Sequence, residues 1–405
     1  MAEITEKQYA PCAIVGTGPA GMIAALSLSA MNIPCKLIGP PANLEDMRTT
    51  ALMDASVAFL QNMGLWQHLA MDFTPLRRMR LIDATGRLIR APETTFDARE
   101  LDLEAFGYNI KNNSLNETLW SLVQSSEYIE HINGSLKTIS TNDLSARLIL
   151  TDGSAIDAGV VIGADGRNSP TREAAGIETT RWSYPQSALV LNVSHSLPHN
   201  FTSTEFHQAT GPLTFVPLPG NDSSVVCVVK PEEGEALFNL SKEDLALELE
   251  RRASSVLGAF EVISTAQLYP MSGLRALKMS GNRSMLVGEA AHAFPPIGAQ
   301  GLNLSLRDIA VAVDLIVKAG AKGERVGDAQ MIEAYHNQRS ADVITRTNAV
   351  DLLNRSLLSA HLPVQMVRAV GLYGAANLPF LRKLLMREGI APSWNMPRLM
   401  IRKGA

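Results

Sequence analysis

The 405-residue sequence predicts an α/β fold in which a parallel-sheet domain is interrupted by an inserted, mainly antiparallel β-sheet domain and followed by a helical C-terminus. Three observations predict this fold. Glycine-centred blocks recur at residues 16–21, 163–166 and 288–303, and two of them lie between a short apolar strand and a helical pattern. Short-strand patterns occupy two separate stretches between these blocks. The length exceeds the usual size of one core, so two domains are expected.

The first glycine block predicts a site for a dinucleotide. Gly16-Thr-Gly-Pro-Ala-Gly21 follows an apolar strand at residues 13–15 and precedes a helical pattern that begins at Met22. Backbone amides in the turn over Gly18, Pro19 and Ala20, together with the positive end of the helix dipole, would face a pyrophosphate. Gly21 would let the helix pack closely on the strand, as in a Rossmann-like fold.

The second strand, at residues 34–38, ends without the acidic residue that usually holds the adenosine ribose. Gly39-Pro-Pro follows the strand instead. The sequence is compatible with two substitutes: Glu45 or Asp46 reaches back, or backbone groups and water bind the ribose.

The remaining chain alternates between helical and strand patterns. Helical spacing recurs at residues 55–69, 115–122, 242–253 and 302–319, and strands are expected at 79–83, 87–89, 146–150, 160–162 and within 187–230. We therefore expect a discontinuous dinucleotide-binding domain at residues 1–75, 101–180 and 271–345. The substrate-binding β-sheet domain is expected at residues 76–100 and 181–270, and the helical C-terminal region at 346–405.

The third block predicts a second strand-to-helix cradle. Gly288-Glu-Ala-Ala-His292 follows a strand at residues 284–287, and Gly298-Ala-Gln-Gly-Leu-Asn303 opens a long helix. His292 is expected to make a structural hydrogen bond rather than act as an acid or base.

Composition excludes several classes of function. A formal net charge of -4 without a long basic run argues against nucleic-acid binding. Three cysteines without CxxC spacing argue against a disulfide scaffold or a cysteine metal site, and His195 and His199 lie in a polar loop without a carboxylate cluster, so no metal is expected. The uncharged stretch at residues 9–35 is broken by Pro and Gly at strand-turn-helix spacing. A cytoplasmic protein, soluble or peripheral to the inner membrane, is expected.

The C-terminal stretch is apolar with basic ends, and two interpretations remain open. Its basic residues form either a solvated face or a contact with an anionic membrane surface. The apolar helices either meet a membrane or cover the nucleotide-binding domain and help form an oligomer. The basic residues are Arg382, Lys383, Arg387, Arg398, Arg402 and Lys403.

With all three blocks in place, the chain resembles the group A flavoprotein monooxygenases of the p-hydroxybenzoate hydroxylase fold. The third block is most similar to that of the FAD-dependent ubiquinone-biosynthesis hydroxylases. Their signature runs His, Pro, Gly-Gln-Gly, Asn and a closing Arg-Asp, and residues 292–308 match it with small departures. The resemblance implies a Rossmann-like FAD-binding domain of the glutathione reductase and p-hydroxybenzoate hydroxylase type.

The resemblance also implies roles for individual residues. Arg48 would lie near the pyrophosphate or flavin, Asp165 would contact FAD and shape the nicotinamide route, and Glu289 would hold the ribityl hydroxyls. Backbone amides after Gly298 would face the flavin pyrimidine edge. The full expected FAD set is Gly16, Gly18, Pro19, Ala20, Gly21, Arg48, Asn112, Asp165, Gly288, Glu289, Pro295, Gly298, Ala299, Gln300, Gly301, Leu302 and Asn303.

Four residues depart from the family pattern. Glu289 stands where the family generally has Asp, and Asn112 stands where many relatives carry an Arg that contacts FAD. Ala299 and Ser305 each replace a glycine. None of these changes removes a group on which flavin binding mainly depends, because that binding rests on backbone amides and hydroxyl contacts.

The reaction implied by the family transfers the distal oxygen of an FAD C4a-hydroperoxide, formed with O2, to the ring of a polyprenylated phenol. NAD(P)H or another donor would reduce FAD, and other ubiquinone-biosynthesis proteins are possible partners. Phe215, Val216 and Pro296 are candidates for the substrate wall, although Phe215 and Val216 also fit plain sheet core. No catalytic base stands out.

Three alternative functions remain open beside the hydroxylation of a polyprenylated phenol. A monooxygenase of a small soluble aromatic would have a short, closed pocket rather than an apolar tunnel. A flavin reductase or flavin halogenase is a second enzyme class, although the Trp-x-Trp-x-Ile-Pro motif is absent from the sequence. The third is a non-catalytic flavin-binding member of a quinone-biosynthesis complex.

Overall fold

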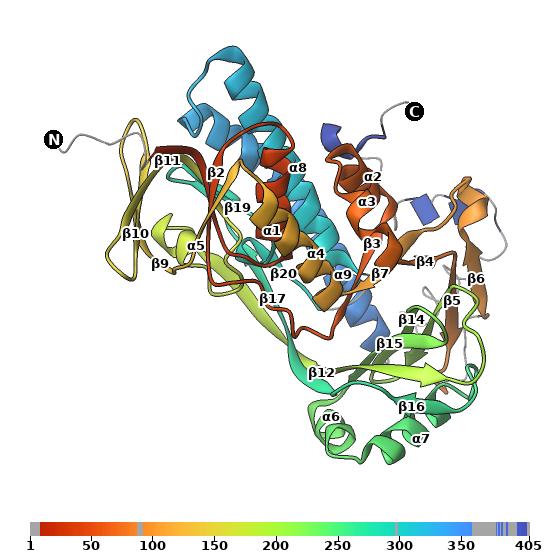
Figure 1. The fold of residues 1–405 in the computed structure, drawn as a ribbon. Helices are drawn as coiled ribbons and strands as arrows, with labels where there is room; N and C mark the ends of the chain where they lie inside the picture. Colours follow the sequence, from red (N-terminus) through yellow and green to blue (C-terminus); the bar gives the residue numbers. More distant parts are fainter. Residues whose placement is uncertain are drawn as a thin grey trace.

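The computed structural model describes residues 9–86, 92–295, 299–358 and 395–402, together with 378, 380, 382–383 and 386–387. Two sheets dominate it, an eight-stranded and a nine-stranded one, and a three-stranded sheet lies beside them (Figure 1). Helices cover one face of the eight-stranded sheet, and a helix pair packs on the nine-stranded one. The α/β fold with an inserted, mainly antiparallel sheet is therefore confirmed.

Parallel strands form the centre of the eight-stranded sheet, in the order β19, β11, β1, β2 and β8. The strands β9, β10 and β18 add to it in antiparallel fashion. The bounds are β1 (Tyr9–Val15), β2 (Cys35–Ile38), β8 (Ile129–Ile132), β9 (Leu136–Thr141), β10 (Ala146–Leu150), β11 (Ala155–Gly163), β18 (Ser280–Gly281) and β19 (Ser284–Leu286).

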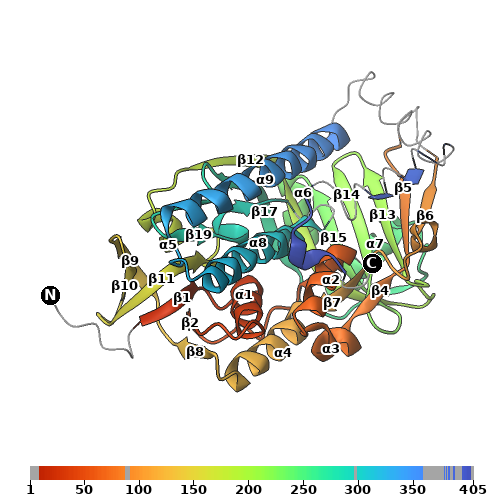
Figure 2. The ribbon, with the colours of Figure 1, turned by 90° about the horizontal axis from the view of Figure 1, so that it is seen from above.

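Helices α1, α4 and α8 pack on one face of this parallel sheet and supply much of the largest core cluster, whereas β9 and β10 pack on the other face. Figure 2 shows α8 and α9 side by side on this domain. The bounds are α1 (Pro19–Ser29), α2 (Asp54–Asn62), α3 (Trp66–Leu69), α4 (Asn112–Ser125), α5 (Pro170–Ala174), α8 (Gln300–Lys322) and α9 (Ala329–Leu358). The helix expected over residues 55–69 is divided into α2 and α3, because Gly64 between them has a φ of +70°.

The nine-stranded sheet runs β20, β17, β12, β15, β14, β13, β5 and β6, with β16 paired to β12. All pairs are antiparallel except β13 with β5. The bounds are β5 (Arg78–Asp83), β6 (Thr94–Asp97), β12 (Thr179–His195), β13 (Thr202–Gln208), β14 (Gly211–Pro217), β15 (Asp222–Val229), β16 (Phe260–Val262), β17 (Gln267–Ala276) and β20 (His292–Ala293). The strand expected at residues 87–89 lies outside the described residues.

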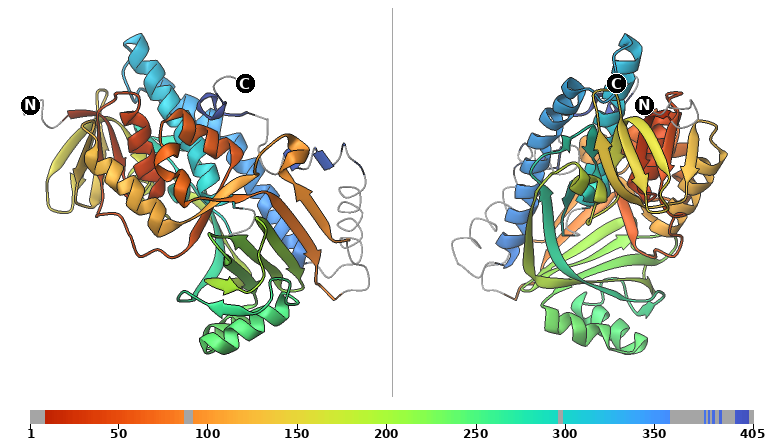
Figure 3. Two further views of the ribbon diagram at one scale, coloured as in Figure 1. Left: turned by 45° about the vertical axis from the view of Figure 1, so that its right-hand side comes forward. Right: turned by 90° about the vertical axis from the view of Figure 1, so that its left-hand side faces the viewer.

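One face of this sheet is covered by α6 (Pro231–Phe238) and α7 (Lys242–Arg252), which lie far from the parallel sheet in both views of Figure 3. The long strands β12 and β17 pair with each other, and β17 also pairs with β20 in the third glycine block. The nine-stranded sheet, the expected substrate-binding sheet, is therefore joined through β20 to the third glycine block.

A three-stranded sheet of β3 (Thr49–Met53), β7 (Gly107–Lys111) and β4 (Thr74–Leu76) lies between the two larger sheets. Within the described ranges no helix is long and apolar enough to cross a membrane. Most of the expected helical region 346–405 lies outside the described residues, although α9 continues to Leu358.

Three of the basic C-terminal residues that the structure describes make ion pairs with the rest of the molecule. Arg382 binds Glu100 at 2.7 Å, Arg398 binds Asp314 of α8 at 2.8 Å, and Arg402 binds Asp54 of α2. The contacts of Arg398 and Arg402 favour the interpretation in which the C-terminus covers the nucleotide-binding domain, whereas Arg382 binds the expected substrate-binding domain.

Candidate cofactor site

The first and second glycine blocks touch each other at the carboxyl ends of β1 and β11. Gly16 has a φ of +113°, and a Cβ there would lie 2.2 Å from the Ala164 carbonyl oxygen. A Cβ on Gly21 would lie 1.9 Å from the Gly16 carbonyl oxygen. Only glycine fits at both positions, which explains the spacing of the first block.

Gly18 differs from its two neighbours in the motif because it faces open space. It caps α1, Pro19 takes the first helical position, and a Cβ on Gly18 would meet no atom within 4 Å. The first N–H groups of a helix have no carbonyl partner within the helix, and the dipole is positive there. The start of α1 is therefore a cradle that an anionic group can fill.

Gly288 joins this cradle to a second one at the start of α8. It has a φ of +58°, and a Cβ would lie 2.9 Å from Ser305 Oγ and 3.7 Å from the Cβ of Ala20. The third block thus sits between the first turn of α1 and the second turn of α8.

The start of α8 is also open. Ala299, the N-cap, has a left-handed φ of +52°, a conformation that favours glycine. A Cβ on Gly301 would meet no atom within 4 Å. The expected set continues through Gln300 and the half-buried Leu302, whereas Pro296 and Gly298 lie outside the described residues and Pro295 is buried beside them.

Arg48 and Asn112 meet at Asp46. The Arg48 guanidinium donates from Nε and Nη2 to Asp46 at 2.8 and 2.7 Å, and Asn112 Nδ2 donates to Asp46 Oδ2 at 3.0 Å. Burial raises the pKa of Asp46, but the hydrogen bonds from Arg48 and Asn112 outweigh it and lower the pKa overall. These contacts argue against Asp46 as the ribose acid.

The same Arg48 lies within reach of two further groups. Its guanidinium carbon is 5.8 Å from the centre of the Tyr269 ring. The hydrogen bond to Asp46 raises the pKa of Arg48, and the charge of the exposed Glu289 adds to this effect. The structure therefore joins Arg48 and Asn112 through Asp46, and the charge of Glu289 acts on Arg48.

Two residues of the expected FAD set have side chains that accept hydrogen bonds from the protein itself. Asp165 accepts hydrogen bonds from Ser169 Oγ at 2.5 Å and from the Thr171 N–H at 2.8 Å, so its carboxylate holds the start of α5. The Asn303 amide oxygen accepts from the Met53 N–H at 2.8 Å and from Ser56 Oγ at 2.7 Å. The contacts of Asp165 and of the Asn303 backbone with FAD stay predictions.

His292 is part of a buried hydrogen-bond network. Its Nε2 donates to Asp308 Oδ2 at 2.6 Å, and the Gly288 N–H donates to the same oxygen at 3.1 Å. Arg339 Nε donates to the other oxygen, Oδ1, at 2.7 Å. Burial raises the pKa of Asp308, but the charges on His292 and Arg339 outweigh it and lower the pKa. This geometry supports a structural role for His292.

The hydrogen-bond network of Asp308 continues along α9, a helix in which the sequence predicted no site residues. Asp342 accepts hydrogen bonds from Arg339 Nη1 at 2.6 Å, from Arg307 Nε at 2.6 Å and from Arg346 Nε at 2.8 Å. Arg307 also donates to the Asn395 carbonyl at 3.1 Å. Arg307 and Asp308, the closing Arg-Asp of the signature, therefore fix α8 to α9, and Arg307 also binds residues 395–396. The i, i+3 and i+7 spacing of Arg339, Asp342 and Arg346 was the available sequence signal.

Phe215 and Val216 lie on opposite faces of the nine-stranded sheet. Phe215 is 1 % exposed and packs with Phe260, at 5.3 Å between ring centres, in the core under α6 and α7. It is a core residue rather than a substrate wall. Val216 pairs with Ser224, whose Oγ is hydrogen bonded at 2.9 Å by Thr49 Oγ1 of β3. The Val216 face therefore meets the nucleotide-binding domain.

The two candidate metal ligands have other partners. His195 Nδ1 is 2.7 Å from the Leu197 carbonyl oxygen and its Nε2 is 3.0 Å from Ser223 Oγ, whereas His199 Nε2 is 3.0 Å from the Leu218 carbonyl oxygen. In the described part of the chain, no group of three or more His, Cys, Asp and Glu side chains is placed to hold a metal ion.

The site as a whole fits FAD. Two helix N-termini, each with a glycine that borders open space, meet at Gly288, and the negative charge of Glu289 acts on Arg48. The first is suited to a pyrophosphate and the second to negative charge on a reduced flavin ring.

Comparison with known proteins agrees with this geometry. A model of the FAD binding domain family matches residues 9–347. The 3-demethoxyubiquinol 3-hydroxylase of Escherichia coli is 30% identical over 93% of this chain and 97% of its own. The chain belongs to the FAD-dependent ubiquinone-biosynthesis hydroxylase family.

Other members of this hydroxylase family agree. The ubiquinone hydroxylase UbiL of Rhodospirillum rubrum is 29% identical over 93% of this chain and 88% of its own. The fold also matches the crystal structure of p-nitrophenol 4-monooxygenase PnpA from Pseudomonas putida, with a TM-score of 0.78 and 17% identity over 94% of this chain and 97% of that chain. The chain is an FAD-dependent monooxygenase, a class that uses O2 and typically a reduced pyridine nucleotide.

Proposed function

We propose that this chain hydroxylates the aromatic ring of a polyprenylated phenol in ubiquinone biosynthesis. The observation that carries the proposal is the pair of open cradles at Gly18 and Gly301, joined through Gly288. They occur in a chain that matches 97% of the length of a 3-demethoxyubiquinol 3-hydroxylase. Bound FAD, once reduced, supplies the activation of O2 that such a hydroxylation needs.

The residues of this chain would bind and orient the reactants. The amides at the start of α1 would hold the pyrophosphate, and those at the start of α8 would stabilise negative charge on the flavin ring. Glu289 would hold the ribityl hydroxyls, with its extra methylene accommodated by its exposed position next to Arg48. Asn112 would act through Asp46, which it shares with Arg48.

The substrate ring would lie against the sheet face that carries Val216. Val190 and Val226 are paired across β12 and β15, and Val226 is paired with Thr214 beside Val216, so these valines share one face. All three are partly buried. The three valines would give a ring and an isoprenoid tail apolar contacts, and Thr214 and Ser224 add polar side chains to the same face.

A polyprenylated substrate dissolves in lipid, so the enzyme must reach a membrane surface. We propose a cytoplasmic protein peripheral to the inner membrane that works beside other ubiquinone-biosynthesis proteins and takes electrons from NAD(P)H. Relatives named ubiquinone biosynthesis monooxygenase COQ6, mitochondrial, support this placement in the pathway.

Deleting the gene in its native host and analysing the extracted quinones by mass spectrometry tests the proposed pathway. We expect a prenylated phenol that lacks one oxygen atom, and its structure would identify the hydroxylated ring carbon. Complementation with the wild-type gene should restore ubiquinone. Unchanged ubiquinone in a strain without a paralogue would contradict the proposal and favour a small soluble aromatic substrate.

A further inference from the structure

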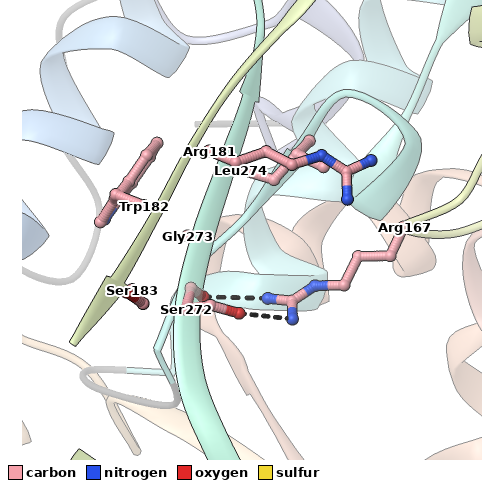
Figure 4. A pocket seen from close by; sticks show the side chains of 7 residues that line it. All are labelled: Arg167, Arg181, Trp182, Ser183, Ser272, Gly273 and Leu274. Carbon is pink, nitrogen blue, oxygen red and sulfur yellow. Dashed lines mark hydrogen bonds between the residues drawn. The ribbon is translucent and has the colours of Figure 1, made fainter. Parts of the chain in front are cut away.

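A polar pocket lies next to the second glycine block and is lined by residues of β12 and β17. Its volume is about 330 Å³. Figure 4 shows the guanidinium groups of Arg167 and Arg181 on the same side of β17, whereas Trp182 lies on the other side. The lining residues are Arg167, Arg181, Trp182, Ser183, Ser272, Gly273 and Leu274.

Arg167 is held in place by the protein but keeps unused hydrogen-bonding capacity. Its Nη1 donates to Ser272 Oγ at 2.8 Å and its Nη2 donates to the Ser272 carbonyl at 2.9 Å. Its Nε is buried without a hydrogen-bond partner among the described residues. The guanidinium is therefore fixed in orientation before any ligand arrives.

Arg181 is exposed and weakly held. Its Nε lies 3.5 Å from Thr179 Oγ1, the limit of a hydrogen bond. A third arginine, Arg172, is buried nearby and donates to the Ala290 carbonyl at 2.8 Å. Burial lowers the pKa of Arg172, and the positive charge of Arg181 lowers it further.

Little negative charge compensates these three arginines. No acidic side chain lines the pocket, and within the described ranges none of the three forms an ion pair. The nearest acids that act on Arg172 are Asp165 and Glu173, and the Asp165 carboxylate is engaged by Ser169 and Thr171. Guanidinium groups gathered without counter-charges favour an anion, and their planar donor forks match phosphate oxygens.

We propose that the pocket between Arg167 and Arg181 binds the phosphate or pyrophosphate group of a ligand. Ser183 and Ser272 also line the pocket, and its volume exceeds that of an inorganic phosphate, so the rest of the ligand has room. Arg172 and the pairing of β17 with β20 connect the pocket to the third glycine block. The phosphate would come from a soluble dinucleotide or from a phospholipid headgroup.

Titration calorimetry on the FAD-loaded protein tests this site without any hydroxylation, so it is independent of the proposed function. Loading with FAD fills the cofactor cradle, so inorganic pyrophosphate reports on the second pocket. We expect Arg181→Gln to weaken pyrophosphate binding by at least about tenfold, and Arg181→Lys to weaken it less, because a charge-assisted guanidinium contact is lost or replaced by a point charge. Arg325→Gln, an exposed arginine after α8, is the matched control and should bind as wild type.

The same variants distinguish the two sources of phosphate. Displacement of pyrophosphate by NADPH would assign the pocket to a nucleotide, and displacement by phosphatidylglycerol vesicles, but not by phosphatidylcholine vesicles, would assign it to a lipid headgroup. An unchanged flavin spectrum and thermal unfolding curve establish that Arg181→Gln is folded. The proposal is overturned if wild type binds none of these probes, or if Arg181→Gln binds them as Arg325→Gln does.

Discussion

His292 Nε2 lies 2.6 Å from Asp308 Oδ2, and both side chains are almost completely removed from solvent. Through the Gly288 N–H, the same carboxylate oxygen also holds the third glycine block. A residue that resembles a catalytic histidine thus fixes the position of the backbone between the two cradles.

Asp308→Asn should destabilise the protein strongly. The change leaves Arg339 with a single anionic partner, Asp342, in a buried site, and losing one member of a buried ion pair costs about 3–5 kcal/mol. Urea unfolding monitored by circular dichroism measures the loss. A variant within about 0.5 kcal/mol of wild type, the range of surface substitutions, would contradict the role of this network.

Substitutions at two glycines of the first block should have different effects, one on FAD binding and the other on folding. Gly18→Ala has room in the protein, so thermal unfolding without FAD should match wild type, while FAD affinity falls by about tenfold, or about 1.4 kcal/mol, because the methyl group enters the cradle. Gly21→Ala should instead disrupt folding, since its Cβ would overlap the Gly16 carbonyl. Equal FAD affinities for Gly18→Ala and wild type, measured by flavin fluorescence, would show that the cradle lies elsewhere.

Phe215 and Val216 should respond in opposite ways to substitution. Phe215→Ala empties a core position and should cost about 3–5 kcal/mol of stability. Val216→Trp should leave stability closer to wild type but raise KM for a prenylated phenol, because the larger side chain projects from the substrate face. Steady-state kinetics beside urea unfolding checks both; a normal KM for Val216→Trp would remove Val216 from the substrate wall.

Acid should weaken the junction between α8 and α9. Burial alone would raise the pKa of Asp342, but Arg339, Arg307 and Arg346 outweigh it and lower the pKa from 3.8 to about 2. A depressed folded-state pKa stabilises the protein above the unfolded value, and the contribution is lost as pH falls from 3.8 to about 2. Unfolding free energies between pH 5 and pH 2 should fall more steeply for wild type than for Asp342→Asn; parallel slopes would contradict this.

The glycine cradles could be predicted from the sequence because local sterics impose them. Gly16 and Gly21 each face a backbone oxygen that no side chain could approach, so the spacing itself carries the information. The faces of the inserted sheet could not be predicted in the same way. Phe215 and Val216 are neighbours in sequence, and only the pairing with β15 reveals which of them faces the nucleotide-binding domain.

The buried network on α9 also escaped prediction, for a different reason. Arg339 and Asp308 are 31 residues apart and meet only because α8 packs on α9. In the sequence, Arg339 and Asp342 have the appearance of an exposed polar helix face. The motif predicted a contact with FAD for Asp165 and for the Asn303 backbone, but not that the Asp165 carboxylate holds the start of α5 or that the Asn303 side chain binds β3.

Transfer of oxygen from O2 to a prenylated ring tests the central claim most directly. The purified, FAD-loaded protein would be given NAD(P)H, a prenylated phenol and isotopically labelled ¹⁸O2, and the product analysed by mass spectrometry. We predict one ¹⁸O atom in a new ring hydroxyl, and none when FAD is removed. Oxidation of NAD(P)H without labelled product, or a product oxygen that comes from water, would contradict the assignment as a monooxygenase of this substrate.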